Sequence, residues 1–380
     1  MLLQGQSNKG FLIEVLRKYY GQRPLVEPPL LPKREIAVQP IGSNTYIRHL
    51  SFPSMIKLYE YILENPPLHL YYSVAVYEDP SVEDMESKGL LKADLMFDID
   101  VDHFEACRDT VNVCLKCGYV YSGGRECPKC SSKEVSSIPQ LSNECFRLGW
   151  AGVLTLVDIL EKEFGAREIT VSFSGSRGFH VRVEDEHLTV LDRDSRRAIV
   201  EYLNLSNLVL EKIVPRIGRG RDAKALFFKD REHGFRSRLR ELAEQLLSVE
   251  DYGDYILVKY SDLEGLLDTM RIEIDTVVTI DTSRLSRFIH SINGKSGLAV
   301  CRLDPDKDYS FSFRDYRVVD GEVVVKPRYD IPEAWFLDKK MSLRAGEKKR
   351  VEAYIGLYLV LKGLVDIIDY SGVEVRKPCL

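Results

Sequence analysis

Hydrophobic and polar residues alternate along this chain with two different periods, so both helices and strands are predicted. Apolar residues that recur every three or four positions predict amphipathic helices, whereas apolar and aromatic runs with a period of two predict strands. The helical pattern occupies residues 9–20, 53–63, 141–164, 192–212, 236–247 and 347–369. The strand pattern occupies residues 68–77, 93–101, 168–173, 179–183, 276–280, 297–303, 309–313 and 323–325. This mixture predicts an α/β fold in the broad sense that includes α+β.

Two segments interrupt this pattern and divide the chain into parts. Between residues 104 and 139 the sequence becomes rich in Cys, Gly, Ser and Lys and loses its apolar periodicity. A second insertion, at residues 188–265, is rich in helical pattern. At roughly 150 residues per domain, a chain of 380 residues predicts two or three folded units. We therefore expect a core made of residues 1–103, 140–187 and 266–380, a small module at 104–139 and a helical subdomain at 188–265.

The composition is that of an ordinary globular protein. The chain has 53 Lys and Arg against 58 Asp and Glu, and 44% of its residues are hydrophobic, which excludes fibrous and disordered classes. No apolar run reaches the ~20 residues that span a bilayer, because the best candidate, 355–368, contains Lys362 and Asp366. The first ten residues lack the basic segment and apolar stretch of an export signal. We expect a cytoplasmic protein that does not bind membranes.

Two C-x2-C knuckles, separated by nine residues, lie in the first insertion. Each knuckle directs two thiolates at one point, and two knuckles together complete a tetrahedral zinc site in which all four positions are filled by protein. Two disulfides are the alternative. Cys107 and Cys145 we interpret as small apolar residues. The knuckles predict a structural zinc ion bound by Cys114, Cys117, Cys127 and Cys130.

The segment Phe97-Asp-Ile-Asp-Val-Asp102 carries closely spaced carboxylates at the end of an apolar strand. Because side chains alternate along a strand, Asp98, Asp100 and Asp102 should lie on one face. Oxygen ligands at this spacing suit Mg²⁺ or Mn²⁺, with substrate phosphates and water completing the coordination. The alternative is a strand that ends in solvent with ordinary surface acids. The Asp-x-Asp spacing is common in proteins, so the metal-site interpretation depends on the other segments of the chain described below.

A glycine-rich turn, Ser174-Gly-Ser-Arg-Gly178, joins the two predicted strands 168–173 and 179–183. Gly175 and Gly178 allow positive φ and a close approach of the backbone. Free N–H groups in such a turn, beside Arg177 and His180, suit a phosphate group. A plain hairpin with its arginine in water is the alternative. The combination favours an anion site.

A third segment repeats the theme of an aspartate after an apolar run. Here Asp281 follows the predicted strand 276–280, and the chain continues through Arg287 to Gly294-Lys295-Ser-Gly297. Residues 215–240 form a separate basic stretch, with 9 Lys and Arg against 3 Asp and Glu. That stretch is either a surface for a nucleic-acid backbone or a solvated loop.

Taken in order, the segments Phe97–Asp100, Ser174–His180 and Asp281–Gly297 resemble the small catalytic subunit of archaeal and eukaryotic DNA primases. The cysteine-rich insertion that follows the Asp-x-Asp strand is also similar to that family. The resemblance implies a primase-type mixed-sheet catalytic core with a zinc-binding insertion and a helical insertion. It also implies synthesis of short RNA primers, with DNA primers as a second option, from nucleoside triphosphates on single-stranded DNA.

The same resemblance implies roles for individual residues. Two divalent ions, Mg²⁺ or Mn²⁺, are expected at Asp98, Asp100 and Asp281. The nucleotide is expected at Ser174, Gly175, Arg177, His180, Arg287 and Lys295. Many relatives have His where this chain has Asn293, and His290 is out of register to replace it. Members of this family work with a larger subunit that carries an iron–sulfur cluster, so a heterodimer is expected.

Two other functions compete with this one. A repair polymerase or terminal transferase of the same fold would extend existing ends without initiating new ones. A non-catalytic zinc-ribbon protein would only bind nucleic acid, but separately placed aspartates would then repel phosphates without benefit. Synthesis on unprimed single-stranded DNA distinguishes a primase from both.

Overall fold

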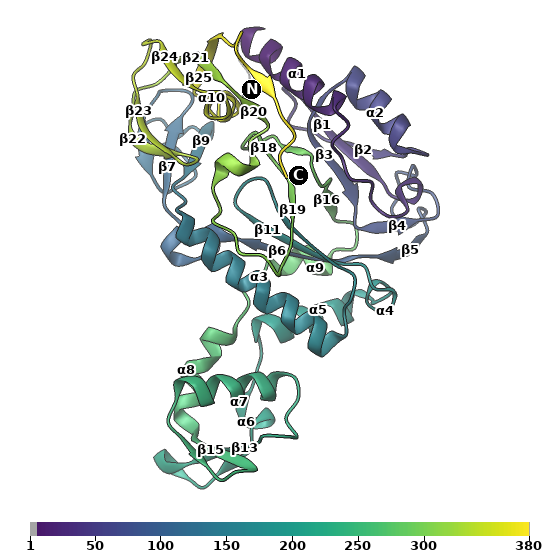
Figure 1. The fold of residues 1–380 in the computed structure, drawn as a ribbon, viewed down its shortest axis with the longest axis vertical. Coiled ribbons are helices and arrows are strands. Elements are labelled where there is room, and N and C mark those ends of the chain that lie inside the picture. Colours follow the sequence, from purple (N-terminus) through teal and green to yellow (C-terminus); the bar gives the residue numbers. More distant parts are fainter. Residues whose placement is uncertain (1–5, 380) are drawn as a thin grey trace.

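The computed structural model describes residues 6–379, which form a main body and a smaller lobe set apart from it (Figure 1). Residues 1–5, which begin the segment where we find no export signal, lie outside the described part. Within the described part, no helix is both long and apolar enough to cross a membrane. Helices and strands are interspersed along the chain, and the α/β class in its broad sense is confirmed.

Ten α-helices are described. They are α1 (Gln6–Gly21), α2 (Met55–Glu64), α3 (Asn143–Phe164), α4 (Glu186–Thr189), α5 (Arg193–Asn204), α6 (Leu210–Ile213), α7 (Phe235–Leu246), α8 (Tyr260–Met270), α9 (Thr276–Ile280) and α10 (Ala353–Leu361). Short 3-10 turns are η1 (Leu31–Lys33), η2 (Val101–His103), η3 (Glu105–Cys107), η4 (Gly220–Asp222) and η5 (Phe313–Tyr316).

Two four-stranded sheets form the centre of the main body. The first has the order β16 (Leu285–Arg287), β3 (Pro67–Ser73), β1 (Ile36–Pro40) and β2 (Ile47–Leu50). The second has the order β19 (Cys301–Leu303), β10 (Ile169–Phe173), β11 (Gly178–Val183) and β6 (Leu95–Asp100). Every strand pair among residues 6–379 is antiparallel, so the sheets are not of the mixed type that we expected.

Smaller sheets surround these two. The cysteine-rich insertion is a sheet of β8 (Val120–Ser122), β7 (Thr110–Cys114) and β9 (Val135–Pro139). Near the C-terminus lie β24 (Lys349–Glu352), β21 (Glu322–Pro327) and β25 (Val365–Asp369), with the pairs β22 (Ile331–Phe336) and β23 (Lys339–Leu343), and β20 (Val319–Asp320) and β26 (Glu374–Val375). The remaining pairs are β4 (Ala75–Tyr77) with β5 (Leu90–Ala93), and β17 (Ile292–Asn293) with β18 (Leu298–Ala299).

The lobe has a hydrophobic core of its own, made of residues between Leu205 and Met270. It contains α6, α7 and α8 and a four-stranded sheet in the order β12 (Arg216–Ile217), β13 (Lys224–Phe228), β15 (Tyr255–Lys259) and β14 (Val249–Asp251). The expected subdomain at 188–265 is therefore not purely helical. Helix α5 instead packs into the main core through Ile199 and Leu203, so the lobe begins after it.

Several predicted elements differ in the structure, including the helix 192–212, which is divided into α5 and α6. The apolar run 347–369 contains β24, α10 and β25 in place of one long helix. Every residue of α10 is buried, and a run that is apolar on all sides carries no period by which to tell helix from strand. The segment 276–280, predicted as a strand, is helix α9, and 309–313 forms no strand.

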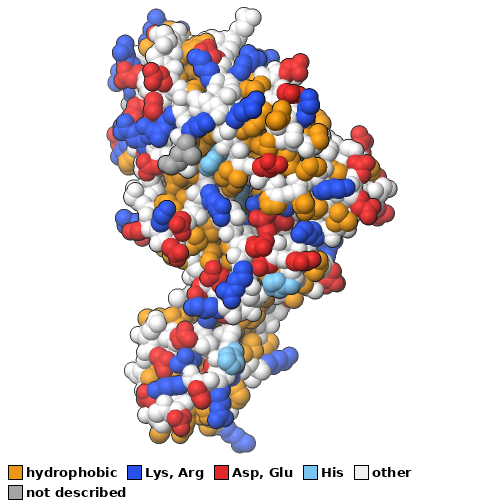
Figure 2. Space-filling model, turned by 45° about the vertical axis from the view of Figure 1, so that its right-hand side comes forward, with side chains coloured by type: hydrophobic (Ala, Val, Ile, Leu, Met, Phe, Trp, Pro, Cys, Tyr) orange, Lys and Arg blue, Asp and Glu red, His pale blue; other side chains and the backbone are white. Residues whose placement is uncertain are grey.

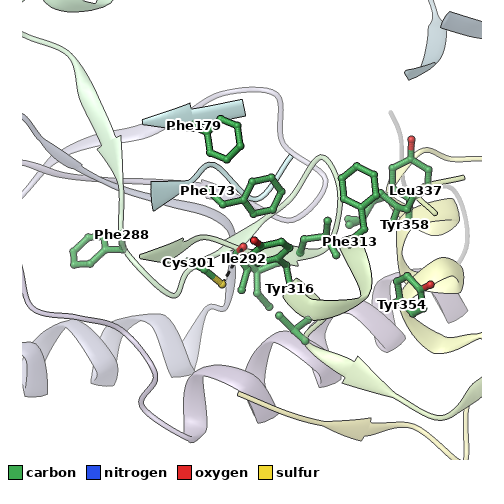
Figure 3. Packing of buried hydrophobic residues seen from close by; sticks show 14 of the residues in the cluster. Phe173, Phe179, Phe288, Ile292, Cys301, Phe313, Tyr316, Leu337, Tyr354 and Tyr358 are labelled. Carbon is green, nitrogen blue, oxygen red and sulfur yellow. Dashed lines mark hydrogen bonds between the residues drawn. The ribbon is translucent and has the colours of Figure 1, made fainter. Parts of the chain in front are cut away.

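The C-terminal segments complete the core around the second sheet. Phe313 and Tyr316 lie between Phe173 of β10 and Tyr358 of α10 (Figure 3). The rings of Phe173 and Tyr316 are 4.3 Å apart between centroids. This packing attaches α10 to the sheet that carries the candidate site.

Four cysteines outside the knuckles are paired as disulfides. Cys107 bonds to Cys145, and Cys301 bonds to Cys379. Our interpretation of Cys107 and Cys145 as small apolar residues is therefore wrong. Their Cα atoms are 5.8 Å apart, because the chain before β7 passes next to the start of α3.

Helix α3 covers one face of the second sheet, and a glycine permits its close approach. A Cβ atom at Gly149 would lie 2.7 Å from Cγ1 of Val101 and 3.0 Å from the ring of Phe179, both of which are buried. One turn further, a Cβ atom at Gly152 would lie 3.9 Å from its nearest neighbour. The helix therefore packs on the sheet at Gly149.

We predict opposite effects for alanine at these two positions. Gly149→Ala should destabilise the protein by ~1–3 kcal/mol, because the added methyl overlaps the sheet. Gly152→Ala is the matched control and should be neutral or stabilising by up to ~1 kcal/mol, because alanine favours the helix. Denaturant midpoints of the two variants measure the difference, and equal destabilisation would show that the contact at Gly149 does not limit the packing.

Candidate active site and metal centre

The pairing of β6 with β11 sets the geometry of the site. In this antiparallel register His180 lies opposite Asp98, and Gly178 lies opposite Asp100. The alternating residues Phe97 and Ile99 are buried towards the core, whereas the two aspartates are partly exposed on the other face. Two carboxylates and a histidine therefore share one face of the sheet.

Each carboxylate of this face has a basic neighbour. Nε2 of His180 lies 3.1 Å from Oδ1 of Asp98, and a guanidinium nitrogen of Arg177 lies 4.0 Å from Asp100. A second nitrogen of Arg177 forms an ion pair with Asp102. Strand β6 ends at Asp100 and the turn η2 follows, so Asp102 does not continue the row of aspartates as we predicted. Instead, its carboxylate holds the arginine.

The turn between β10 and β11 is a tight hairpin closed by Ser174. Its N–H donates to the carbonyl of Gly178 (2.9 Å), and its hydroxyl accepts from the N–H of Gly178 (3.2 Å). Only Gly175 has positive φ, +75°. Gly178 is required for a different reason, because a Cβ atom there would lie 2.2 Å from the carbonyl oxygen of Ile99. The two predicted glycine roles are thus divided between the two positions.

The segment after β17 is fastened to this turn by uncharged hydrogen bonds. The amide nitrogen of Asn293 donates to the carbonyl of Ser174 (2.8 Å), and the hydroxyl of Ser296 donates to the carbonyl of Gly175. The amide oxygen of Asn293 accepts from the N–H of Lys295 (3.0 Å). Asn293 therefore positions the turn and the lysine with both ends of its side chain. His290 lies elsewhere, with Nδ1 at 3.0 Å from the carbonyl of Pro24.

The structure places Asp275, and not the predicted Asp281, on the wall of the cavity that Asp98 and Asp100 line. The segment between them is helix α9, so the two residues lie at its opposite ends. The N–H of Asp275 donates to the carbonyl of Asp98 (3.0 Å), and its side chain lines the same cavity. The carboxylate of Asp281 instead accepts hydrogen bonds from the N–H and hydroxyl of Ser283, and it does not line the cavity. The prediction of a strand at 276–280 gave no reason to consider Asp275.

His69 was not predicted, although it positions a predicted residue. Its Nδ1 lies 2.8 Å from Arg287 and accepts from the N–H of Gly294 (3.3 Å). Burial, followed by the charges of Arg287 and Lys295, lowers the pKa of His69 to about 2, so its ring is neutral and can accept. The guanidinium of Arg287 also lies 4.7 Å over the ring of Tyr71. A single histidine in an apolar strand gave no signal in the sequence.

These side chains converge on one cavity of about 240 Å³. Its charged and titratable lining residues are Asp98, Asp100, Asp275, Arg177, His180, Arg284, Arg287 and Lys295. Ser174 also lines it, whereas Gly175 acts through its backbone. Nine residues are predicted for catalysis and nucleotide binding, and seven of them line this cavity. Six of the seven are charged or titratable, and the seventh is Ser174.

The charges of this cavity are only partly balanced by their neighbours. Burial raises the pKa of Asp100, and the nearby carboxylate of Asp98 raises it further. Burial and the charges of Arg287 and Arg177 lower the pKa of Lys295. A cation between the carboxylates and an anion between the basic groups would each favour the charged forms. The residues therefore fit divalent ions at the carboxylates and a phosphate chain at the basic groups.

Ligand atoms come closest together beside this cavity. Among residues 6–379, oxygen or nitrogen atoms of Asp100, Asp102 and His103 lie within 4.8 Å of one another, so they could hold a metal ion. Asp98 shares the strand face with Asp100 but does not belong to that group. The described residues thus bring one set of possible ligand atoms together at Asp100, and Asp98 lies outside that set.

The four knuckle cysteines form the second candidate metal centre. Their sulfur atoms lie within 4.8 Å of one another, with Cys114 and Cys130 at 3.6 Å, and Cys117 and Cys127 at 3.6 Å. A tetrahedral site with Zn–S bonds of about 2.3 Å has sulfur separations of roughly 3.8 Å. Burial raises the pKa of Cys114, but backbone N–H groups of Cys117 and Lys116 outweigh it and bring the pKa to about 6. The knuckles therefore fit zinc.

The basic stretch 215–240 is largely neutralised by neighbouring acids. Ion pairs join Lys224 to Glu250, Lys229 to Asp251, Arg236 to Glu232, Arg238 to Glu163 and Arg240 to Glu244. Basic and acidic side chains are intermixed on the lobe in Figure 2. The structure favours a salt-bridged surface over a continuous basic path for nucleic acid.

Comparison with known proteins gives a consistent result. The profile of the DNA primase small subunit family matches residues 136–304. The DNA primase small subunit PriS of Staphylothermus marinus is 43% identical over 379 residues, which cover 99% of this chain and 100% of that protein. The proteins of the same name from Saccharolobus islandicus and Aeropyrum pernix are 34% and 33% identical, over 97% and 92% of this chain and 98% and 91% of their own.

We predict that the knuckle cysteines hold zinc stoichiometrically. Cys114→Ser or Cys127→Ser should release the metal and loosen residues 104–139, lowering template binding before metal-dependent chemistry. Cys107→Ser, in the same stretch but outside the knuckles, is the control and should keep the metal. Elemental analysis of the purified proteins measures this. Zinc that is absent from the unaltered chain, or that survives in both knuckle variants, would contradict the assignment.

We also predict that Asp275 matters for catalysis and Asp281 does not. Asp275→Asn removes a charge but keeps the cap on the N–H of Val277 (3.0 Å), so folding should be preserved. Losing a charged contact of ~3 kcal/mol should slow nucleotide incorporation by about 100-fold. Asp281→Asn, which can keep its bonds to Ser283, should change it by less than about threefold. Single-turnover rates decide, and the reverse order would restore Asp281 to the site.

Proposed function

Because this chain belongs to the DNA primase small subunit family, and is thus a nucleotidyltransferase that makes primers, we propose that its cavity joins nucleotides by two-metal chemistry. The observation that carries this proposal is that carboxylates and basic side chains line one and the same cavity. The carboxylates are those of Asp98, Asp100 and Asp275, and the basic groups are those of Arg177, Lys295 and Arg287. Few other ligands need both kinds of contact as a metal-bound triphosphate does.

The carboxylates would hold the divalent ions, Mg²⁺ or Mn²⁺. Bound there, the ions would lower the pKa of the attacking hydroxyl and neutralise charge on the leaving group. We assign Asp275 to this set in place of Asp281, since only Asp275 lines the cavity. The raised pKa of Asp100 supports the assignment, because a carboxylate crowded by burial and by Asp98 gains most from a cation.

The basic side chains would hold the triphosphate. Arg177 presents a planar fork suited to two phosphate oxygens, and Lys295 presents a single charge from the facing segment. His180 would orient Asp98 and reach the same phosphates, while His69 keeps Arg287 in place. Because these groups are fixed before substrate arrives, little reorganisation accompanies the reaction.

The reaction follows from this arrangement. The oxygen of a 3′-hydroxyl forms a bond to the α-phosphorus, and the bond from that phosphorus to the β-phosphate oxygen breaks. The hydroxyl proton passes to water, and pyrophosphate leaves. The side chains of the cavity supply no separate general base. Their work is to align the three groups in line and to stabilise the charge that develops on the phosphate oxygens.

We further propose a single-stranded DNA template, nucleoside triphosphate substrates, a larger partner subunit and a cytoplasmic location. The name small subunit, carried by the relatives, implies a larger one. A preference between ribonucleotides and deoxynucleotides would depend on contacts to the sugar. Tyr71 lines the cavity beside Arg287 and is a candidate for such a contact.

The test is synthesis on unprimed single-stranded DNA with Mg²⁺ or Mn²⁺ and labelled nucleotides, with and without a partner subunit. Asp98→Asn and Asp100→Asn should each abolish incorporation while folding and template binding persist, because each change removes a metal ligand at nearly constant volume. Asp308→Asn, at an exposed position outside the cavity, is the control.

Three results are informative. Loss of synthesis in both cavity variants, but not in the control, supports the proposal. Activity in both cavity variants would contradict two-metal catalysis at Asp98 and Asp100. Extension of primed ends without any synthesis on unprimed template would instead favour a repair polymerase or terminal transferase.

A further inference from the structure

Two further cavities adjoin the cavity that we propose for the nucleotide. A second cavity of about 170 Å³ shares Ser176, Arg177 and Lys295 with it, and a third of about 290 Å³ shares Lys295. Lys362, at the end of α10, lines both of these further cavities. The three cavities thus adjoin one another at Lys295, and together they extend from the aspartates to the zinc-binding insertion.

The second cavity is positively charged without any acid of its own. Arg177, Lys295 and Lys362 line it, and no Asp or Glu among the described residues does so. Serine and threonine side chains, including Ser137 and Thr110, supply most of its other polar lining. Phe313, Leu337 and Tyr358 form an apolar wall, and they lie close together in Figure 3. Such a lining suits a strongly charged anion.

Among residues 6–379, the groups that contact the ammonium of Lys362 are neutral. Its Nζ donates to the carbonyl of Ser137 in β9 (2.8 Å) and lies 5.4 Å from the centre of the Tyr358 ring. Burial, followed by the charges of Arg177 and Lys295, lowers the pKa of Lys362 to about 8. A bound anion would remove this conflict between three cations.

A second polar group beyond Lys362 also lacks a partner. The hydroxyl of Ser136 makes no hydrogen bond within the described part of the chain, although the residue is only 4% exposed. It lines the third cavity together with Lys295 and Lys362. Buried hydroxyls are normally paired, so this one is free for a ligand or for the water around it.

We propose that the cavity between Arg177, Lys295 and Lys362 is a diphosphate subsite, with Lys362 as its outermost binding residue. This inference rests on the proposed function, because the aspartates then fix the α-phosphate and the phosphate chain extends away from them. The diphosphate has two sources, the β- and γ-phosphates of a bound nucleotide and the pyrophosphate released from it. Lys362 makes the end of α10 and the zinc-binding insertion part of the nucleotide site.

The position of the cavity favours a diphosphate over a template strand. It shares Arg177 and Lys295 with the nucleotide cavity, so an anion there would be continuous with a triphosphate. A template backbone needs a path lined by repeated cations, whereas the three cations here line a single cavity of about 170 Å³. Template binding is therefore the competing outcome of the test.

The test uses the full chain, Mg²⁺ and inorganic pyrophosphate, with binding measured by calorimetry. Lys362→Met keeps the aliphatic stem but removes the charge, and it should weaken pyrophosphate binding by about tenfold or more, as for loss of one charge-assisted contact. Binding of a nucleoside monophosphate should stay within about twofold. Lys349→Met is the matched control, because its Nζ also donates to a backbone carbonyl, that of Ser342 (2.8 Å), outside the cavity.

Two further arms keep the result interpretable. Lys362→Arg shares any packing damage but retains the charge, so it should keep most of the pyrophosphate affinity. A matching loss of nucleoside triphosphate affinity in Lys362→Met would show that the subsite is filled before the bond breaks. Unchanged triphosphate affinity would show that only the released pyrophosphate enters, and either result supports the subsite.

Other outcomes overturn it. If Lys362→Met binds pyrophosphate like the unaltered chain, or loses affinity for single-stranded DNA instead, Lys362 does not belong to a diphosphate subsite. Equal loss in Lys349→Met would assign the effect to general charge. If the unaltered chain neither binds pyrophosphate nor incorporates nucleotides, the proposed function fails as well. Normal incorporation with an unaffected variant defeats this inference alone.

Discussion

The antiparallel register between β6 and β11 is the constraint on which the rest of the site depends. It sets His180 opposite Asp98 and Gly178 opposite Asp100, so a shift by one residue would turn both carboxylates into the core. Gly178 makes this register possible at the end of β6, because any side chain there would overlap the carbonyl of Ile99. On the other face, Gly149 lets α3 cover the sheet closely. The position of the charges thus follows from backbone contacts.

The loops around the sheet are fixed mainly by uncharged hydrogen bonds, which leaves the charged groups for ligands. Asn293 and Ser296 fasten one segment to the turn of Ser174 and Gly175. Asp275 caps α9 and donates its N–H to Asp98, which ties a third segment to β6. The basic side chains of the cavity are less fully paired: Arg177 is shared between Asp100 and Asp102, and Lys295 lies near Arg177 and Arg287. A site built this way is ordered before it binds but gains much from metal and phosphate.

Much of this arrangement could be predicted from the sequence, and the failures have physical causes. Helices α1, α2 and α3 follow clear amphipathic patterns, and the β10–β11 hairpin follows its glycine turn. The segment 276–280 is rich in β-branched residues and was predicted as a strand, but it forms α9 against β6, where Thr279 donates to the carbonyl of Met96 (2.8 Å). Tertiary contacts outweighed local propensity there, and α9 places Asp275, rather than Asp281, next to Asp98.

Residues that act through another residue could not be predicted in the same way. His69 and Lys362 carry no motif, and each becomes meaningful only through a neighbour that is distant in sequence, Arg287 or Arg177. The disulfide between Cys107 and Cys145 joins an insertion to a helix, which spacing alone does not reveal.

We propose that Asp98 and Asp100 hold catalytic ions that face a triphosphate. Anomalous diffraction from crystals with Mn²⁺ and a non-hydrolysable nucleoside triphosphate tests it most directly. We expect manganese bound by Asp98 and Asp100, with phosphates between Arg177 and Lys295. Manganese found only at Asp102 and His103 would show that Asp98 and Asp100 do not hold the ions.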